Sequence, residues 1–474
     1  MKNTEFLEKI RNSSCAVLGF GISNRPLITF LLDLGVTDIT VHDKKSIEEL
    51  GEAAAQFAQN GVSFITGEDY LDRIDAAVVF RSPGIRDDYA GIARAVENGA
   101  ILTSEMELFF ALTPATIIGI TGSDGKTTTT TLCAKILEAE FAGTDRHVYL
   151  GGNIGTPLLP LVRQMTERDF AVVELSSFQL KTMKQSPCRA VITNLSPNHL
   201  DWHTGMDEYV ESKFNICSHE GNTRLITNAE NETTVMLAER IGAHVTFFSS
   251  KKDNYAEICG DVAGRKAVFE RDGEIILSDG IIERIVIKTS DIKLLGRHNV
   301  ENYMAAIGML DGWVSCESVR RVATTFGGVA HRMEFVRTLD GVSYYNSSID
   351  SSPTRTAAAI STLDRKPIVI CGGYDKHIPF EPLGKTLCQR AKGVILTGAT
   401  ADVIRRAIEQ DAGYGQSDLF VETCPDFEAA VNRARQVATE GDIVVLSPAC
   451  ASFDAFRNFE ERGNTFRDIV NRFE

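Results

Sequence analysis

The residues with the clearest chemistry lie at positions 117–128, where glycines precede Lys126 and Thr127. The apolar run at 116–120 predicts a buried parallel strand, and 128–140 predicts a helix. Glycines allow backbone N–H groups to turn inward around a phosphate, and the N-terminus of a helix adds partial positive charge. In such a loop the lysine contacts the β- and γ-phosphates of a nucleotide, and the threonine hydroxyl binds Mg²⁺.

The spacing of this loop is more specific than that of a general nucleotide site. From Gly119 to Thr127 it reads G-x-x-G-x-x-G-K-T, which differs by one residue from the general pattern. The alternative is a glycine turn that only begins a helix. The strand, Lys126 and Thr127 together favour a phosphate-binding loop over that alternative.

Two further segments place polar side chains after predicted strands. Glu174 ends an apolar strand, where parallel sheets gather their ligands, and a carboxylate there suits Mg²⁺. The next predicted strand is followed by His199, Asp201 and His203. These three alternate along the chain, so they need not share one face. We expect one histidine at most to bind metal or substrate, and for His199 a structural role is equally open.

Three other polar residues carry weaker signals. Lys213 lies in a predicted helix over 207–217, where a lysine is ordinarily solvated. Asn302 lies in a short polar segment whose amides can contact a nucleotide. Arg332 falls at a predicted domain boundary, where an arginine can clamp phosphate or form a structural ion pair.

The first hundred residues must build a parallel sheet with crossover helices, because predicted strands and helices alternate. Strands are predicted over 15–19, 39–42 and 76–80, and helices over 26–34 and 47–60. Gly19 and Gly21 after the first strand, with Asp43 after the second, resemble a dinucleotide fingerprint, but Asn24 occupies the third glycine position. We therefore expect a nucleotide-type anion here rather than a redox cofactor.

The rest of the chain predicts two more α/β units. The second begins near Glu105 and carries the phosphate-binding loop; between 250 and 287 its short segments and Asp-Gly turns predict antiparallel hairpins. The third begins near Val329, with strands predicted over 342–345, 367–371, 393–396 and 443–446. The chain is therefore predicted to be an α/β protein with domains 1–104, 105–328 and 329–474.

Composition excludes several classes of protein. Hydrophobic residues at 43% and charged residues at 24% are typical of a globular chain, and the net charge of −15 without a basic run argues against nucleic acid. Cys15, Cys133, Cys371 and Cys450 adjoin apolar stretches, which predicts buried thiols in a reducing cytosol. No apolar run reaches membrane-spanning length and the N-terminus has no apolar signal core, so we expect a cytoplasmic protein without membrane insertion.

Taken together, the motifs resemble those of the Mur ligases, the ATP-dependent amide-forming enzymes of peptidoglycan precursor synthesis. The resemblance covers essentially the whole chain. Its discriminating strings are G-G-N-I-G from Gly151, E-L-S-S-F-Q-L from Glu174 and L-S-P-A-C-A-S-F-D-A-F-R-N-F-E-E-R-G-N from Leu446. The last belongs to the amino-acid-binding domain and points to the D-glutamate-adding members.

The resemblance implies a Rossmann-like N-terminal domain for a UDP-linked substrate, a central P-loop ATPase-type domain with a mostly parallel sheet, and a Rossmann-like C-terminal domain for an amino acid. It implies UDP-N-acetylmuramoyl-L-alanine and D-glutamate as substrates, ATP and Mg²⁺ as cofactors, and a monomer. The reaction would pass through an acyl phosphate and a tetrahedral intermediate.

The resemblance also assigns residues. It implies that the UDP moiety is bound by Ser23, Asp43, Lys44, Ser82, Pro83 and Gly84. It implies that ATP is bound by Gly122, Ser123, Asp124, Gly125, Lys126, Thr127, Thr128, Asn302 and Arg332. Further substrate contacts are Asn153, Ser176, Gln179 and His199, with D-glutamate on Lys376, Ser452, Phe453 and Phe459. The implied catalytic residues are Lys126, Glu174, His199 and Lys213, and the implied metal ligands are Thr127, Glu174, His199 and a carbamylated Lys213.

Several positions depart from the family pattern. Asp124 stands where asparagine is usual, and Asn198 where an acid is common. Ser347 and Ile349 replace an aspartate and a lysine, and Asp375 is shifted by one position. These departures bear on nucleotide binding rather than on the class of reaction.

Two alternatives stay open at the level of sequence. A folylpolyglutamate synthase-like ligase shares the loop and a glutamate acceptor, but lacks a UDP-binding first domain. The other alternative is a nucleotide-gated binding or regulatory protein that hydrolyses ATP slowly, which the phosphate-binding loop by itself would also fit.

Overall fold

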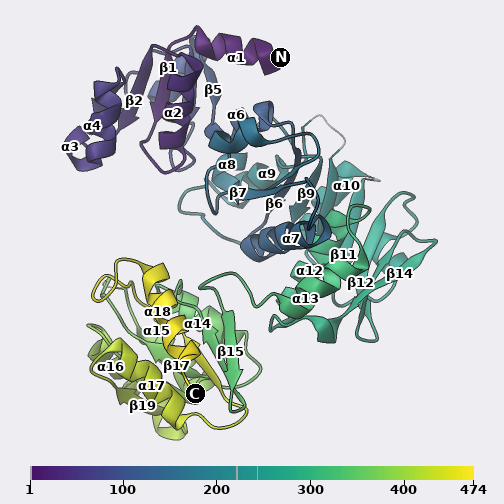
Figure 1. Ribbon diagram of the computed structural model, residues 1–474, viewed down its shortest axis with the longest axis vertical. Coiled ribbons are helices and arrows are strands. Elements are labelled where there is room, and N and C mark those ends of the chain that lie inside the picture. The colour runs from purple at the N-terminus through teal and green to yellow at the C-terminus, as the bar shows by residue number, and fades with distance from the viewer. Residues whose placement is uncertain (1–2, 220–222, 243, 377) are drawn as a thin grey trace. The chain divides into compact units, whose positions relative to one another are not determined.

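A computed structural model describes residues 3–219, 223–242, 244–376 and 378–474. It is an α/β protein with three sheets, in which most strand pairs are parallel (Figure 1). The chain forms two compact units. The first comprises Met1–Thr289 and Glu301–Val322, and the second comprises Ser290–Val300 and Ala323–Glu474. The division into domains 1–104, 105–328 and 329–474 stays a prediction.

The first sheet has five parallel strands in the order β3-β2-β1-β4-β5. Its strands are β1 (Cys15–Leu18), β2 (Ile39–Asp43), β3 (Ser63–Thr66), β4 (Val78–Arg81) and β5 (Ile101–Thr103). The helices are α1 (Asn3–Arg11), α2 (Asn24–Leu34), α3 (Ile47–Leu50), α4 (Glu52–Gln59) and α5 (Ala90–Glu97). Strands β2 and β3 lie on one side of β1, and β4 and β5 lie on the other side. Because β1 and β4 are adjacent and parallel, the loops that follow them lie next to each other.

The single helix predicted over 47–60 is wrong. Gly51 separates α3 from α4 and has a φ of +79°, a conformation that side chains other than glycine rarely adopt. The apolar pattern continues across the break, which is why it suggested one helix. The three strands predicted in this region are confirmed within two residues at each end.

The second sheet has nine strands in the order β14-β13-β12-β11-β10-β9-β6-β8-β7. They are β6 (Thr116–Thr121), β7 (Val148–Gly152), β8 (Phe170–Glu174), β9 (Arg189–Ile192), β10 (Arg224–Asn228), β11 (Val245–Ser249), β12 (Lys266–Arg271), β13 (Glu274–Ser278) and β14 (Glu283–Lys288). Strands β12, β13 and β14 pair antiparallel, which confirms the predicted hairpins. The other pairs are parallel.

Helices of this region begin with α6 (Glu105–Leu112), α7 (Lys126–Glu140), α8 (Ser177–Leu180) and α9 (Met206–Phe214). They continue with α10 (Glu232–Ile241), α11 (Tyr255–Cys259), α12 (Arg297–Leu310) and α13 (Cys316–Thr325), and the 3-10 turns η1 (Leu159–Gln164) and η2 (Thr289–Asp291). Strand β6 lies between β8 and β9, so the loops after these three strands share one edge of the sheet.

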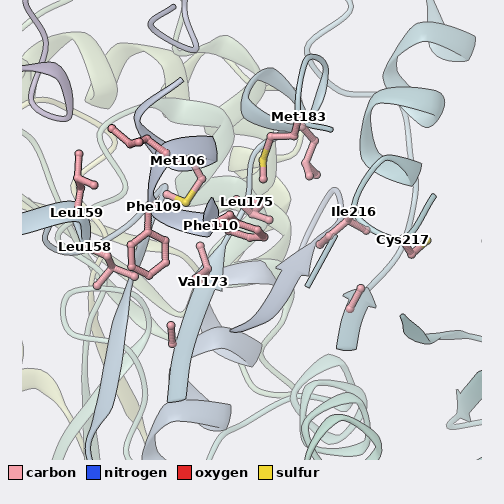
Figure 2. Packing of buried hydrophobic residues seen from close by; sticks show 14 of the residues in the cluster. Met106, Phe109, Phe110, Leu158, Leu159, Val173, Leu175, Met183, Ile216 and Cys217 are labelled. Carbon is pink, nitrogen blue, oxygen red and sulfur yellow. The ribbon is translucent and has the colours of Figure 1, made fainter. Parts of the chain in front are cut away.

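A buried apolar cluster supports that edge. Figure 2 shows Met106, Phe109 and Phe110 of α6 packed near Val173 and Leu175, which flank Glu174. Full burial of such a side chain contributes about 1.5–3 kcal/mol. The polar end of β8 therefore projects from a well-packed base.

The third sheet has six strands in the order β15-β16-β20-β17-β18-β19, and only β15 and β16 pair antiparallel. The strands are β15 (Glu334–Leu339), β16 (Val342–Asn346), β17 (Ile368–Cys371), β18 (Gly393–Leu396), β19 (Phe420–Thr423) and β20 (Ile443–Leu446). The helices are α14 (Pro353–Ser361), α15 (Glu381–Arg390), α16 (Ala401–Glu409), η3 (Tyr414–Gln416), α17 (Phe427–Val437) and α18 (Phe459–Asn471). All four strands predicted here are confirmed.

Two predictions from composition can be compared with the described residues. The thiols of Cys15, Cys133, Cys371 and Cys450 are buried, as predicted. Within the described ranges, no helix has the length and apolar character needed to cross a membrane.

Candidate active site

The glycine-rich loop joins β6 to α7 and contains two glycines in unusual conformations. Gly122 and Gly125 have φ values of +143° and +77°. A Cβ at Gly122 would lie 1.9 Å from the Thr193 hydroxyl oxygen, and one at Gly125 would lie 2.5 Å from Asn302 Oδ1. Only glycine fits either place, so the loop closely approaches Thr193 and Asn302.

The segment after β9 holds the same loop from the other side. The Ser123 backbone N–H donates to the Asn194 carbonyl at 2.9 Å, and the Asp124 N–H donates to Asn194 Oδ1 at 3.0 Å. The Ser123 hydroxyl donates to the Ser196 carbonyl at 3.0 Å. The segment that leads to His199 is therefore fixed to the phosphate-binding loop.

Two lysine side chains meet at this loop. Lys126 Nζ donates to the carbonyls of Gly122 and Ser123 at 3.0 and 2.9 Å. Lys213 Nζ, from α9, donates to the same Gly122 carbonyl at 2.8 Å and to the Thr121 hydroxyl at 3.3 Å. Lys213 is only 2% exposed. The expectation that it is a solvated helix lysine is therefore wrong.

The surroundings of Lys213 disfavour its charged form. Burial lowers its pKa well below the usual range, and the nearby Lys126 ammonium lowers it further, while Glu174 and Asp124 oppose the shift. A lowered pKa means that more of the amine is neutral at any given pH than for an exposed lysine. A neutral buried amine is nucleophilic, which a surface lysine is not.

Glu174 offers one uncommitted oxygen. Its Oε1 accepts a hydrogen bond from Asn153 Nδ2 at 2.9 Å, whereas Oε2 is buried and has no hydrogen-bond partner. An unpaired buried carboxylate oxygen is costly unless a cation or donor satisfies it. Beside the phosphate-binding loop, this oxygen fits a divalent cation. Within the described part of the chain, no three His, Cys, Asp or Glu side chains are grouped so that they could hold a metal ion.

The two histidines after β9 have different surroundings. His203 is buried, with Nδ1 3.0 Å from Glu208 Oε1 and Nε2 2.9 Å from the Ser177 hydroxyl, so both ring nitrogens have protein partners. His199 is exposed and has a φ of +53°. Partial burial lowers its pKa, and the charges of Lys126 and Lys213 lower it further. Of the two, His199 is the candidate ligand and His203 is structural.

Ser176 and Gln179 form a capping box at the start of α8. The Ser176 hydroxyl accepts from the Gln179 backbone N–H at 3.2 Å, and Gln179 Oε1 accepts from the Ser176 N–H at 2.9 Å. These two predicted substrate contacts therefore also fix the chain directly after Glu174.

The loop after β1 explains the broken dinucleotide fingerprint. Asn24 is buried, and its Nδ2 donates to the carbonyls of Leu18 and Gly19 at 3.0 and 2.8 Å. Asp43 Oδ2 accepts from the Phe20 N–H at 2.7 Å. An asparagine thus ties the turn together where the fingerprint would use a glycine for close packing.

The other predicted UDP contacts surround this turn. Ser23 precedes α2 without making a capping hydrogen bond, and Lys44 forms an exposed ion pair of 2.9 Å with Glu68. The Ser82–Gly84 turn follows β4, and a Cβ at Gly19 would lie 3.2 Å from Ser82 Cβ. These residues gather where the strand order reverses, which is where ligands bind in sheets of this kind.

The predicted amino-acid site lies in the second unit, after the adjacent strands β17 and β20. Lys376 Nζ donates to the Ser351 carbonyl at 3.4 Å, and Ser452 is buried. Phe453 is 65% exposed, and the Phe459 ring contacts that of His331 at 5.9 Å. The strand order reverses between β17 and β20, so this edge is again a place for a ligand.

Sequence reasoning missed Arg462, which supports the loop that carries Ser452. Arg462 is 2% exposed and donates to the carbonyls of Ala451 and Cys450, both at 3.1 Å, and to that of Ser348 at 2.9 Å. Its position inside the string after Leu446 was the available signal.

The predicted nucleotide contacts Asn302 and Arg332 fall in different units. Asn302 belongs to the first, where its Oδ1 accepts from the Thr129 hydroxyl at 3.2 Å beside the phosphate-binding loop. Arg332 belongs to the second. Its contact with ATP stays a prediction.

Comparison with known proteins places this geometry in a family. Residues 120–310 match the Mur ligase middle domain, and residues 331–450 match the Mur ligase glutamate ligase domain. Named relatives are the UDP-N-acetylmuramoylalanine–D-glutamate ligases of Clostridium novyi, 47% identical over 99% of this chain and 100% of the relative, and of Clostridium acetobutylicum, 46% identical over 99% of both.

Solved structures agree in fold. MurF from Acinetobacter baumannii has a TM-score of 0.55 at 15% identity, covering 98% of this chain and 93% of its own. A pseudomurein peptide ligase type C from Methanothermus fervidus has a TM-score of 0.51 at 17% identity, covering 98% of this chain and 100% of its own. The chain therefore belongs to the Mur ligase family of ATP-dependent amide-forming ligases.

Proposed function

We propose that this enzyme adds D-glutamate to UDP-N-acetylmuramoyl-L-alanine, with hydrolysis of ATP, in peptidoglycan precursor synthesis. The observation that carries the proposal is the meeting of Lys126, Lys213 and the unpaired oxygen of Glu174 at one sheet edge. The named relatives, which match nearly the whole chain at 42–47% identity, support these substrates.

The proposed work is divided among three domains. Residues 1–104 would bind the UDP moiety, 105–328 would bind ATP, and the Rossmann-like 329–474 would bind D-glutamate. Each contains one of the three sheets. In the first and third, the predicted contacts gather where the strand order reverses, which supports a ligand at each place.

ATP would lie on the phosphate-binding loop, with Lys126 against its β- and γ-phosphates and Asn302 beside the loop. Thr127 and Glu174 would hold one Mg²⁺, and His199 with Lys213 a second. When bound, the metal neutralises negative charge on the phosphoryl group in transfer. The phosphoryl group passes to the carboxylate of the L-alanyl residue, which gives an acyl phosphate and ADP.

Lys213 would act as a carbamate rather than as an ammonium ion. An ammonium ion repels a metal and has no lone pair, whereas a carbamate carries negative charge and two oxygen donors. Carbon dioxide adds to a neutral amine, and the buried amine with its lowered pKa meets that need. The carbamate nitrogen keeps one N–H, which can retain the hydrogen bond to Gly122.

D-Glutamate would be bound through its carboxylates by Lys376 and Ser452, in a pocket shaped by Phe453 and Phe459. Its amine attacks the acyl phosphate, and the tetrahedral intermediate collapses to the amide with loss of phosphate. Catalysis then consists mainly of bringing the reactants together and neutralising charge. We place the reaction in the cytoplasm, where ATP is present and free thiols stay reduced.

A coupled ATPase assay tests this function. We expect ADP release to depend on both UDP-N-acetylmuramoyl-L-alanine and D-glutamate, with the UDP-linked dipeptide as product. Activity with a folate acceptor and L-glutamate would favour the folylpolyglutamate synthase-like alternative. Slow ADP release that depends on neither substrate would favour a nucleotide-gated binding protein.

A further inference from the structure

Contacts of Trp202 with Gly84 and Arg86 tie the loop after β4 to the segment that carries His199. The Trp202 indole N–H donates to the Gly84 carbonyl at 3.2 Å. The Arg86 guanidinium group stacks 5.0 Å from the centre of the Trp202 ring and also donates to the Trp202 carbonyl. All these residues belong to the first compact unit.

Glu208 extends this connection to His203. Arg86 donates to both carboxylate oxygens of Glu208, at 3.2 and 3.3 Å, and the same carboxylate lies 3.0 Å from His203 Nδ1 and accepts from the Thr204 hydroxyl at 3.0 Å. Burial raises the pKa of Glu208, but the hydrogen bonds from Arg86, Thr204 and His203 outweigh it and lower that pKa to about 2. Glu208 is therefore charged at neutral pH and pairs with Arg86.

These contacts restrict the backbone conformation at His199. The N–H groups of Trp202 and His203 both donate to the His199 carbonyl, at 3.1 and 3.0 Å. His199 has a φ of +53°, which is unfavourable for a non-glycine residue and persists where surrounding contacts impose it. With Trp202 held by Arg86 and Gly84, and His203 held by Glu208 and Ser177, the carbonyl of His199 has little freedom.

We propose that Arg86 and Trp202 are positioning residues that couple the UDP-binding turn, Ser82–Gly84, to His199. A UDP-linked substrate on the turn would favour the arrangement in which Gly84 accepts from Trp202, and hence the strained His199 that the reaction uses. This inference rests on the proposed function for the role of the turn. It adds a route by which binding of the UDP-linked substrate would set the conformation of His199 at the edge of the second sheet.

The chain offers a built-in probe, because Trp202 and Trp313 are its only tryptophans. The Trp313 ring contacts Arg189 and Phe170, which lie outside this network. In a Trp313→Phe background, Trp202 is the sole indole fluorophore. We expect UDP-N-acetylmuramoyl-L-alanine, added without ATP, to shift its emission in a saturable way, and UDP to do so more weakly.

Arg86→Gln in the same background tests the coupling. We expect the emission shift to fall at least fivefold while the Kd for the UDP substrate, measured by calorimetry, changes less than threefold. In an otherwise unaltered chain, Arg86→Gln should lower kcat about tenfold and raise the Mg²⁺ concentration for half-maximal activity. Arg271→Gln is the matched control, since Arg271 also stacks on an aromatic ring, that of Phe269, and pairs with a carboxylate, that of Glu283, but lies in the β12–β14 hairpins outside the network.

Trp202→Phe gives a second variant if Arg86→Gln does not fold, because it keeps an aromatic ring but removes the bond to Gly84. The same fall in kcat supports the proposal. A full emission shift in Arg86→Gln with normal kcat would overturn the coupling, as would a rise in KM for the UDP substrate alone. If the unaltered enzyme shows the emission shift but makes no UDP-linked dipeptide, the proposed function fails while the coupling stands.

Discussion

Lys126 and Lys213 donate hydrogen bonds to the same atom, the carbonyl oxygen of Gly122, at 3.0 and 2.8 Å. One lysine belongs to the phosphate-binding loop, and the other comes from α9, far along the chain. Burial lowers the pKa of Lys213, and repulsion from the nearby Lys126 ammonium group lowers it further. The pair thus presents one fixed cation and one amine that can react.

The proposed role of the Lys126 ammonium group in phosphoryl transfer can be tested with Lys126→Ala. Because charge develops on the transferred phosphoryl group, we expect kcat to fall by on the order of a hundredfold or more, about 3 kcal/mol. Lys126 is half-buried and donates to carbonyls of its own loop rather than supporting the core, so we expect the thermal unfolding temperature to change little. Near-normal turnover in a folded Lys126→Ala enzyme would remove the loop from the mechanism.

The proposed carbamate on Lys213 can be tested by mass spectrometry and by chemical rescue of Lys213→Ala. Intact-protein mass measured under native conditions with bicarbonate should show one added carbon dioxide, which Lys213→Ala lacks. Lys213→Ala should lose most activity, and a short carboxylate such as acetate should restore part of it. Lys135→Ala, on an exposed lysine of α7 that pairs with Glu138, is the control for loss of a positive charge. Full activity in Lys213→Arg would contradict the carbamate.

Carbamate formation also predicts a pH dependence with a definite sign. A pKa lowered by burial means that the folded state binds fewer protons than the unfolded state between the lowered pKa of Lys213 and about 10.4. Lys213 therefore costs stability at low pH, and this cost shrinks as the pH rises through that window. At limiting bicarbonate, activity should likewise fall as the pH is lowered, and added bicarbonate should recover it. An activity profile unchanged by bicarbonate would argue against this.

The proposed amino-acid site in the second unit predicts selectivity for D-glutamate. A pocket built for two carboxylates leaves buried charge unpaired with D-alanine or D-glutamine, and such mismatches cost large factors in kcat/KM. Lys376→Ala should raise KM for D-glutamate at least tenfold with little change in KM for ATP. Lys385→Ala, on α15 in the same unit, is the control. An equal rise in KM for ATP in Lys376→Ala would place Lys376 at the nucleotide instead.

A buried carboxyl outside the site predicts a change in stability. Burial raises the pKa of Glu105 to about 7, so the folded state holds a proton that the unfolded chain releases above about 4.5. Wild-type stability should therefore fall as the pH rises from about 4.5 through about 7. Glu105→Gln removes this cost and should be more stable at pH 8 by on the order of 1–3 kcal/mol in urea unfolding. Exposed Glu97→Gln should show no such gain, and a Glu105→Gln enzyme less stable than wild type at pH 8 would refute the argument.

The sequence alone predicted those elements whose pattern lies within a short stretch of the chain. The strand, glycine loop and helix around Lys126 follow from a period of apolar residues and from glycines whose φ angles other residues avoid. Glu174 could be placed at the end of its strand for the same reason. Parallel strands expose their carboxyl ends at one edge, so the convergence of these loops was predictable without knowing the exact order of the nine strands.

Only the tertiary structure decided which polar side chains are enclosed. Lys213 has the sequence surroundings of a solvated helix residue, yet α9 turns it onto the Gly122 carbonyl. His199 and His203 look equivalent along the chain, but Glu208 and Ser177 occupy both nitrogens of His203, whereas His199 is exposed. The physical reason is that periodicity sets which face of an element a side chain occupies, whereas burial, hydrogen-bond partners and pKa depend on residues brought close from distant parts of the sequence.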